Sequence, residues 1–442
     1  MIEFKTDQQT INDLNLLPKH HGDISILNYF NSTKTKGGYN ALIHLMETPS
    51  NDIESIKNRV ETIKFVGQLK EQIQACLDDN MLDIIEYYLN QNTVTLRDNF
   101  IDALFDRISY ILKPNNDYYI VTTALQYVGR QISNLKLLID QAGSDLPEFF
   151  RDLQLELQQI TNDENLIALL DPKRKKLSFR QINRFDSLIR KKHTELLQGL
   201  IKRTYLLDAY LSVNQFSENS EFHFPEIKNL EQPVFKVNDI FHPFIEEPVP
   251  CSFELGRENN LCFLTGPNMA GKSTFLKAVS LSVYLAHIGF PVPAKSCELS
   301  VFNGLFTTIN LSDDIKLGYS HYYSEVRRIK ETALNLKSHK KLFVIFDELF
   351  RGTNVKDAYD ASLLITKGFL KSKKSLFIIS SHISEVGEQL TNGGLADLKY
   401  FDSRLEGDIP VNTYQLVDGI SSERHGLAIV KREGIVELLE EG

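Results

Sequence analysis

One stretch of the sequence combines the residue types that bind phosphate groups. It runs from Leu261 to Lys277 and reads LCFLTGPNMAGKSTFLK. The apolar run Leu261–Leu264 predicts a buried strand, Gly266–Gly271 predicts a loop, and a helix is expected from Lys272 onward. Glycine lets the backbone turn tightly and bring its N–H groups against phosphate oxygens, and the start of a helix adds unpaired donors. Strand, loop and helix in this order indicate a phosphate-binding loop.

Two side chains of this loop have separate expected roles. Lys272 is expected to reach the β- and γ-phosphates of a nucleotide, and Ser273 is expected to place its hydroxyl on Mg²⁺. Apolar residues recur at helical spacing after Lys272, which would hold the helix against a sheet. The expected nucleotide cradle consists of Gly266, Pro267, Asn268, Met269, Ala270, Gly271, Lys272, Ser273 and Thr274.

A second set of polar residues follows two other apolar runs. Asp347 and Glu348 come directly after Leu342–Phe346, and His382 comes two residues after Leu376–Ser380. A carboxylate at the end of a core strand beside a phosphate loop can hold Mg²⁺, which is the role expected of Asp347. Glu348 is expected to orient or deprotonate the attacking water, and His382 to sense the terminal phosphate or steady that water. The simpler alternatives are a surface acidic pair and an ordinary loop histidine.

A third motif, LSDDIKLGYSHYYSE, lies between these two sets at Leu311–Glu325. Ser320 is expected to begin a helix whose N–H groups and hydroxyl could meet a phosphate bound to a neighbouring subunit. Without the surrounding motifs, the stretch would be only a polar turn before a helix. The catalytic residues expected from the sequence are therefore Lys272, Glu348, His382 and, acting in trans, Ser320.

The elements that must position these residues change character along the chain. The first two hundred residues or so have leucine and isoleucine at helical spacing, with breaks at Lys36–Tyr39 and Ala142–Pro147. Prolines then accumulate from about residue 217 to 250 and mark a boundary. Beyond it, short apolar runs alternate with helical patterns, which is typical of a mainly parallel sheet covered on both faces.

Composition limits the class of protein. The 442 residues are 42% hydrophobic and 24% charged, as in a globular protein of two or three domains. The amino terminus lacks the pattern of a signal peptide and no apolar run is long enough to span a membrane, which predicts a cytoplasmic protein without a membrane partner. Four cysteines lie far apart, which argues against a zinc site or a disulfide framework.

The net charge of −9 excludes a protein that coats nucleic acid with a basic surface, so any contact with DNA must be local. Residues 173–203 contain eleven basic side chains against Asp186 and Glu195, a net charge of +9. The segment is either a DNA contact surface or the solvated face of a helix. The candidate DNA contacts are Lys173, Arg174, Lys175, Lys176, Arg180 and Arg184.

Together these motifs resemble the ABC-type ATPases of the MutS group, a family of DNA mismatch repair. The resemblance is strong from about residue 240 onward, in GPNMAGKST, SDDIKLGYSHYYSE, DELFRGTNVKDA, SSHISEV and GISSERHGLAIVKREGI, and weaker upstream, where Thr33–Val66 is similar to the start of the family's helical core. It implies ATP and Mg²⁺ as cofactors, a homodimer formed through the ATPase domains, DNA as a partner, and a repair or recombination protein as a further partner. No residue before Gly266 clearly marks a site for the adenine base.

The resemblance implies an α/β fold: a P-loop ABC-type ATPase domain with a mainly parallel sheet, preceded by an all-α core and lever domain. The expected division is an amino-terminal segment at 1–30, a helical domain with a shortened clamp at 31–216, and the ATPase domain at 217–442. From this resemblance we expect the mismatch-reading and connector domains of the repair proteins to be missing, because only about 30 residues precede the helical core. Ala270 stands where the family commonly has glycine, and the family's carboxyl-terminal dimerisation helices look reduced.

Three functions remain open at this point. The first is a dimeric Mg²⁺-dependent ATPase that binds mismatched, damaged or branched DNA through helical arms. The second is a nucleotide-gated switch that recruits a protein and does not bind DNA, which the acidic balance favours. The third, an inactive scaffold, is disfavoured because every expected catalytic position is filled. ATPases of the chromosome-organising type are also disfavoured, because no coiled coil separates Gly266 from Ser312.

Overall fold

The computed structural model describes residues 4–20, 22–91, 116–170, 177–256, 258–309, 321–350, 353–391, 394, 396–406, 409–421 and 439. The chain divides into two compact units. The first, here called the α/β unit, consists of residues 1–26, 48–57 and 220–442. The second, the helical unit, consists of residues 27–47 and 58–219.

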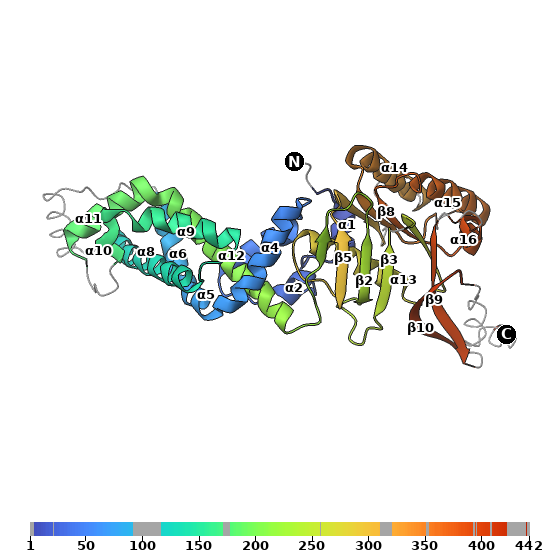
Figure 1. Ribbon diagram of the computed structural model, residues 1–442, viewed down its shortest axis with the longest axis horizontal. Helices are drawn as coiled ribbons and strands as arrows, with labels where there is room; N and C mark the ends of the chain where they lie inside the picture. The colour runs from blue at the N-terminus through green and yellow to red at the C-terminus, as the bar shows by residue number, and fades with distance from the viewer. Residues whose placement is uncertain are drawn as a thin grey trace. The chain divides into compact units, whose positions relative to one another are not determined.

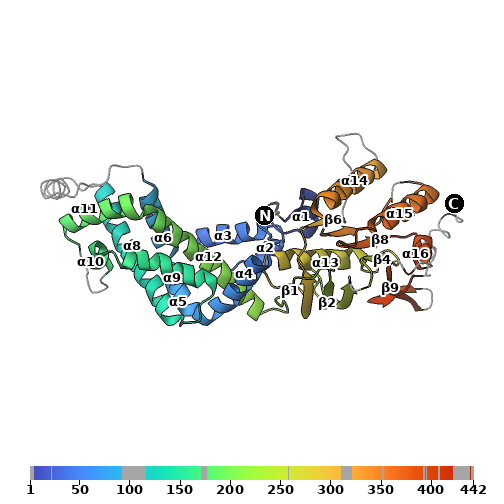
Figure 2. The ribbon, with the colours of Figure 1, turned by 45° about the horizontal axis from the view of Figure 1, so that its top comes forward.

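The helical unit is organised around one long helix, α12 (Thr194–Glu218), against which α3, α5, α6 and α9 pack (Figures 1 and 2). The side chains of α12 are buried around most of its circumference between Leu197 and Asn214, as expected of a central helix. Among the described residues from 26 to 193, the other helices are α2 (Ile26–Phe30), α3 (Lys36–Glu47), α4 (Ile53–Val66), η1 (Gly67–Leu69), α5 (Lys70–Cys76), α6 (Asp79–Asn90), α8 (Asn116–Gln141), α9 (Glu148–Thr161), η2 (Glu164–Leu166), α10 (Ile167–Leu170), α11 (Phe179–Leu188) and the π-helix η3 (Ile189–His193).

The glycine segment Lys36–Tyr39 is not a break before a helix, as the sequence suggested, but the first turn of α3. The reason lies in α12, whose buried Asp208 accepts hydrogen bonds from the N–H (2.9 Å) and the hydroxyl (2.7 Å) of Thr35. A Cβ atom on Gly38 would lie 2.1 Å from that carboxylate. Glycine is therefore required here by the close approach of the two helices.

The α/β unit contains two sheets. The six-stranded sheet has the order β10-β9-β4-β8-β7-β6, and every pair in it except β9 with β10 is parallel. Its strands are β4 (Leu261–Thr265), β6 (Gly304–Thr308), β7 (Leu342–Phe346), β8 (Leu376–Ser380), β9 (Asp397–Glu406) and β10 (Ile409–Asp418). The smaller sheet has the order β1-β5-β2-β3, with β1 (Glu226–Lys228), β2 (Phe235–Ile240), β3 (Cys251–Leu255) and β5 (Ser296–Ser300). The chain is thus mixed α/β.

Helices cover both faces of the six-stranded sheet. On one face, residues such as Val344 and Phe377 pack against α14 (His321–His339), α15 (Val355–Phe369) and α16 (Ser384–Thr391) (Figure 1). On the other face lie α13 (Lys272–His287) and the smaller sheet, where Phe343 of β7 contacts Phe235 of β2 with ring centroids 5.4 Å apart. Strands buried on both faces explain the uninterrupted apolar runs of β4, β7 and β8.

The amino-terminal residues belong to the α/β unit. A short helix, α1 (Gln8–Leu14), lies beside β6, which is the last strand in the order of the six-stranded sheet. Over the part of the chain that the structure describes, no helix is both long enough and apolar enough to cross a membrane.

Candidate functional site

The segment between β4 and α13 has the geometry of a phosphate cradle. Gly266 and Gly271 both have positive φ angles, 137° and 103°, which side chains rarely allow. A Cβ atom on Gly266 would also lie 3.2 Å from the carbonyl oxygen of Phe401 on β9. The two glycines therefore let the loop turn, and α13 begins directly after the second of them.

Lys272 lies inside the loop rather than in solvent. Its Nζ donates hydrogen bonds to the carbonyl oxygens of Gly266 (2.8 Å) and Pro267 (2.9 Å), and the residue is 5% exposed. Burial lowers the pKa of Lys272, and the charges of Glu348 and Asp347 act in the opposite direction. An ammonium group held within the loop is placed to meet a phosphate that enters the same loop.

Ser273 and Asp347 lie together although the sequence separates them widely. The Ser273 hydroxyl donates to Asp347 Oδ2 at 2.5 Å, and the Ser380 hydroxyl donates to Oδ1 of the same carboxylate at 2.5 Å. Over the described residues, no cluster of three or more His, Cys, Asp or Glu side chains could hold a metal ion. One hydroxyl and one carboxylate fit Mg²⁺, which commonly takes few protein ligands and completes its shell with water and nucleotide phosphates.

Glu348 and His382 form the next contact, with His382 Nε2 2.5 Å from Glu348 Oε1. Glu348 has a φ of 57°, and its N–H donates to the Ser380 hydroxyl at 2.9 Å. A positive φ at a residue other than glycine costs free energy and persists only where the surroundings hold it. The backbone of Glu348 is therefore held in place, and its carboxylate contacts an imidazole that is partly open to solvent.

These contacts arise because β4, β8 and β7 are neighbouring parallel strands. The carboxyl ends of parallel strands meet at the same edge of a sheet, and ligands of open α/β sheets bind at that edge. The loop after β4, the carboxylates after β7 and the histidine after β8 are therefore brought together. The structure unites Lys272, Ser273, Asp347, Glu348 and His382 in one site.

A cavity of about 510 Å³ opens beside this loop. Its lining includes residues of the cradle and Glu348, together with Phe241 and His242, which precede the loop and which the sequence did not mark as a base site. Burial, with a smaller effect of Lys277, lowers the pKa of His242 to about 4, and its Nδ1 accepts a hydrogen bond from the N–H of Phe244 at 3.3 Å. A neutral imidazole and a phenyl ring offer flat surfaces against which a planar heterocycle can pack. The sequence feature that could have located these two residues is the motif DIFHP at Asp239–Pro243.

The other cradle residues differ in exposure. Ala270 is fully buried, whereas Met269 is 88% exposed and has a φ of 64°. Its carbonyl accepts a hydrogen bond from Asn412 Nδ2 on β10 at 3.1 Å, so the hairpin of β9 and β10 contacts the loop. Asn268 and Thr274 line the cavity. Ser320 lies outside the described residues.

The predicted DNA contacts are only partly placed. Lys173, Arg174, Lys175 and Lys176 lie outside the described residues. Arg180 and Arg184 are exposed on α11, where Arg184 donates a hydrogen bond to Asn165.

Three other basic side chains of residues 173–203 form ion pairs with acidic side chains of the helical unit. The pairs are Arg190 with Asp186, Lys192 with Asp163, and Arg203 with Glu156. The local positive charge is therefore smaller than the sequence suggested.

Comparisons with known proteins agree with this architecture. The family model of MutS domain III matches residues 9–316, and that of MutS domain V matches residues 262–440. A DNA mismatch repair protein MutS from Fervidobacterium nodosum is 31% identical over 258 residues, which are 57% of this chain and 30% of that protein. Proteins of the same name from Anaplasma phagocytophilum and Bacillus licheniformis are each 30% identical, over 52% and 54% of this chain and 28% of their own length.

The two sheets, the covering helices and the helical unit define a mixed α/β protein. Because the match to MutS domain III covers more than half of the chain, this chain belongs to the MutS family. The family resemblance that the motifs indicated is thereby confirmed. The matched region spans less than a third of the length of these curated relatives.

Proposed function

We propose that this chain is a Mg²⁺-dependent ATPase of the P-loop ABC type, whose nucleotide state is coupled to the binding of DNA by the helical unit. The observation that carries the proposal is the contact of Ser273 with Asp347 beside the Glu348–His382 pair, at the carboxyl ends of neighbouring parallel strands. A cradle, a metal-binding pair and a candidate base are the parts that phosphoryl transfer to water requires.

In this proposal the cradle binds the phosphates. Backbone N–H groups of the loop and the start of α13 donate to the phosphate oxygens, and Lys272 moves from the carbonyls of Gly266 and Pro267 to the β- and γ-phosphates. Ser273 and Asp347 hold Mg²⁺, which when bound supplies charge neutralisation at the phosphates. The cavity that Phe241 and His242 line receives the adenine base.

The reacting water is assigned to Glu348. Its carboxylate accepts a hydrogen bond from the water, orients it in line with the γ-phosphorus and takes its proton as the bond from the water oxygen to phosphorus forms. The bond from the γ-phosphorus to the bridging oxygen breaks in the same step, and ADP leaves with that oxygen. His382, 2.5 Å from the same carboxylate, keeps that oxygen in place and is assigned the sensing of the terminal phosphate. Both side chains follow strands of the six-stranded sheet, so the pair is held on rigid elements.

Two further parts of the proposal rest on family membership. Ser320 of one subunit completes the nucleotide site of another, which makes a homodimer through the ATPase domains the active form. DNA is the expected substrate of the helical unit, with mismatched, damaged or branched forms as candidates, and a repair or recombination protein is a further expected partner. The name of these relatives, DNA mismatch repair protein, supports this assignment.

The test is ATP turnover by the purified protein with Mg²⁺, measured without DNA and with duplex, mismatched and branched DNA over a range of salt concentrations. Turnover that one DNA form stimulates, and that high salt reduces to the DNA-free rate, is the expected result, because phosphate contacts are screened by salt. Absence of ATP turnover with Mg²⁺ would overturn the proposal.

A second candidate is a nucleotide-gated switch that recruits a protein partner and does not bind DNA. The internal ion pairs of Arg190, Lys192 and Arg203 favour it, because they neutralise part of the basic segment. In this case turnover would be the same with every DNA form and at every salt concentration.

A further inference from the structure

The amino-terminal residues 4–14 line the β6 edge of the six-stranded sheet. The N–H of Lys5 donates to the carbonyl of Asn303 (2.8 Å), and the carbonyl of Lys5 accepts from the N–H of Leu305 (3.0 Å), so Lys5 pairs with the start of β6. A Cβ atom on Gly304 would lie 2.3 Å from the carbonyl oxygen of Lys5. Glycine at this position therefore permits the close approach of the amino-terminal residues.

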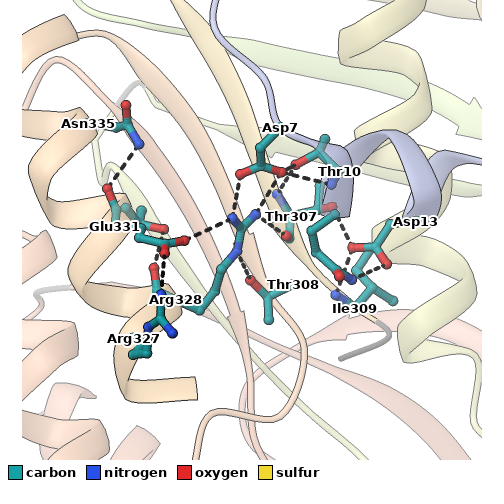
Figure 3. Close-up of polar contacts among 12 residues, drawn as sticks. Asp7, Thr10, Asp13, Thr307, Thr308, Ile309, Arg327, Arg328, Glu331 and Asn335 are labelled. Carbon is teal, nitrogen blue, oxygen red and sulfur yellow. Dashed lines mark hydrogen bonds and ion pairs between the residues drawn. The ribbon is translucent and has the colours of Figure 1, made fainter. Parts of the chain in front are cut away.

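At the other end of β6, side chains of α1 replace this backbone pairing (Figure 3). The Thr10 hydroxyl accepts from the N–H of Thr307 at 3.0 Å. The Asp13 carboxylate accepts from the Thr307 hydroxyl (2.6 Å) and from the N–H of Ile309 (3.0 Å). Thr10 and Asp13 are both buried. Buried backbone donors on an edge strand need partners, and α1 supplies them here.

Arg328 of α14 binds the same strand end from another side (Figure 3). Its Nη2 donates to the carbonyl of Thr307 (2.8 Å), and its Nε donates to the hydroxyl of Thr308 (3.2 Å). The largely buried guanidinium pairs with Asp7, which also caps α1 through the N–H of Thr10 at 2.9 Å. Asp7 therefore joins α1 to α14, and Arg328 joins this pair to the end of β6.

The end of β6 is hydrogen-bonded to the backbone of Asp347, the residue whose carboxylate is proposed to bind the metal ion. The N–H of Asp347 donates to the carbonyl of Thr308 at 2.9 Å. In a parallel strand, alternate residues direct their backbone groups to opposite sides, so Thr307 faces the amino-terminal residues while Thr308 faces β7. A displacement of Thr307 would move Thr308 and, with it, the backbone of Asp347.

We propose that the amino-terminal residues are a positioning element of the nucleotide site. In this inference, which rests on the proposed ATPase function, Asp7, Thr10 and Asp13 fix the end of β6 and thereby the distance of the Asp347 carboxylate from Ser273. They do not touch the nucleotide. Outer residues that orient metal ligands typically affect metal affinity about 10- to 100-fold, so the metal ion is the sensitive probe.

The test is the affinity of the protein for Mn²⁺ in the presence of a non-hydrolysable ATP analogue. The concentration of free Mn²⁺ is measured by its electron paramagnetic resonance signal. The variants are Asp13→Asn, which keeps the shape of the side chain, and Arg328→Lys, which keeps the charge but not the forked donor geometry. We expect each to weaken Mn²⁺ affinity roughly tenfold. Binding of the same analogue without metal should be unchanged, a difference that general destabilisation would not produce.

Matched controls lie on the same two helices. Arg327→Lys changes the neighbouring arginine of α14, which is half exposed and pairs with Glu331, and Gln8→Ala changes an exposed residue of α1. Both should bind Mn²⁺ as the unaltered protein does. Asp7→Asn removes the charge at a more exposed position and should weaken Mn²⁺ affinity. Asp7→Glu should bind Mn²⁺ more tightly than Asp7→Asn, because the ion pair with Arg328 is kept.

The outcomes separate this inference from the proposed function. If the unaltered protein binds no Mn²⁺ with the analogue, the ATPase proposal fails and this inference fails with it. If the unaltered protein binds Mn²⁺ and the folded variants Asp7→Asn and Asp13→Asn bind it equally well, only the inference is overturned. Weaker binding by the variants but not by Arg327→Lys supports it.

Discussion

At the scale of single residues, Glu348 is the most direct test of the chemistry. Glu348→Gln keeps the size of the side chain and a hydrogen bond to His382, but the amide cannot accept a proton from water. We expect ATP turnover to fall by about 10²- to 10⁴-fold, while the affinity for ATP stays within a few-fold of its original value. Single-turnover hydrolysis and equilibrium binding of ATP measure the two effects. Unchanged turnover would remove Glu348 from the catalytic step.

A second prediction at this scale concerns His287, which is buried in α13. Its Nε2 accepts a hydrogen bond from the N–H of Phe302 at 2.9 Å, and its Nδ1 lies 2.7 Å from the carbonyl oxygen of Val283, which accepts from it. Burial lowers the pKa of His287 from 6.5 to about 4, so the folded protein favours the neutral ring. The stabilisation is therefore complete above pH 6.5 and disappears as the pH falls towards 4.

The measurement for His287 is urea unfolding at several values of pH between 7.5 and about 4. The free energy of unfolding should fall over this range in the unaltered protein, with carboxylates contributing to the slope as well. His287→Gln should be less stable at neutral pH and should show a flatter dependence below pH 6.5. Parallel curves for the two proteins would contradict the assignment.

Residues of the site differ in how far the sequence could predict them. The cradle and the Asp347–Glu348 pair were accessible because each lies in a contiguous segment next to a predicted strand. Phe241 and His242 line the cavity only because the smaller sheet folds beside α13, and no periodicity predicts that packing. The pair of Asp7 with Arg328 joins residues that are 321 positions apart, so no local pattern contains it.

At the scale of elements, the packing of α3 on α12 gives a prediction about stability. Gly38→Ala places a methyl group where the buried Asp208 carboxylate lies, 2.1 Å away, and the carboxylate cannot move without breaking its hydrogen bonds to Thr35. We expect the free energy of unfolding to fall by about 1–3 kcal/mol. Gly368→Ala in α15 is the control, because no atom lies within 4 Å of its added methyl group, and it should be neutral or stabilising. Thermal unfolding of both variants compares them.

The strands of the nucleotide edge could be predicted, whereas those of the smaller sheet could not. The apolar runs Leu342–Phe346 and Leu376–Ser380 form β7 and β8 with those bounds, and the run Leu261–Leu264 forms β4, which extends one residue further to Thr265. Strands β1, β2, β3 and β5 are short, lie among prolines and pair across long separations, so their sequence shows only an absence of helical periodicity. The start of α3 depends on Asp208, 173 positions from Thr35.

At the scale of the whole molecule, charge decides which of the two proposed functions holds. The chain carries −9 overall, and two acids that lie outside residues 173–203, Asp163 and Glu156, pair with Lys192 and Arg203 of that segment. A sequence reports the number of bases in a segment but not their partners, so the net +9 of residues 173–203 overstated the charge open to a phosphate backbone. Among the basic residues of that segment that the structure describes, Arg180 and Arg184 are two whose side chains are exposed.

The last prediction follows from this distribution. Binding of duplex DNA by the Arg180→Gln/Arg184→Gln double variant should be weaker, and the slope of log affinity against log salt should fall by about 0.9 for each phosphate that the variant no longer neutralises. Lys70→Gln/Lys136→Gln removes the same charge from exposed positions elsewhere on the helical unit and should leave the slope nearly unchanged. Fluorescence anisotropy of labelled DNA over a salt series measures both. A slope that the arginine variant does not alter would exclude α11 from the DNA surface, because every neutralised phosphate releases counterions.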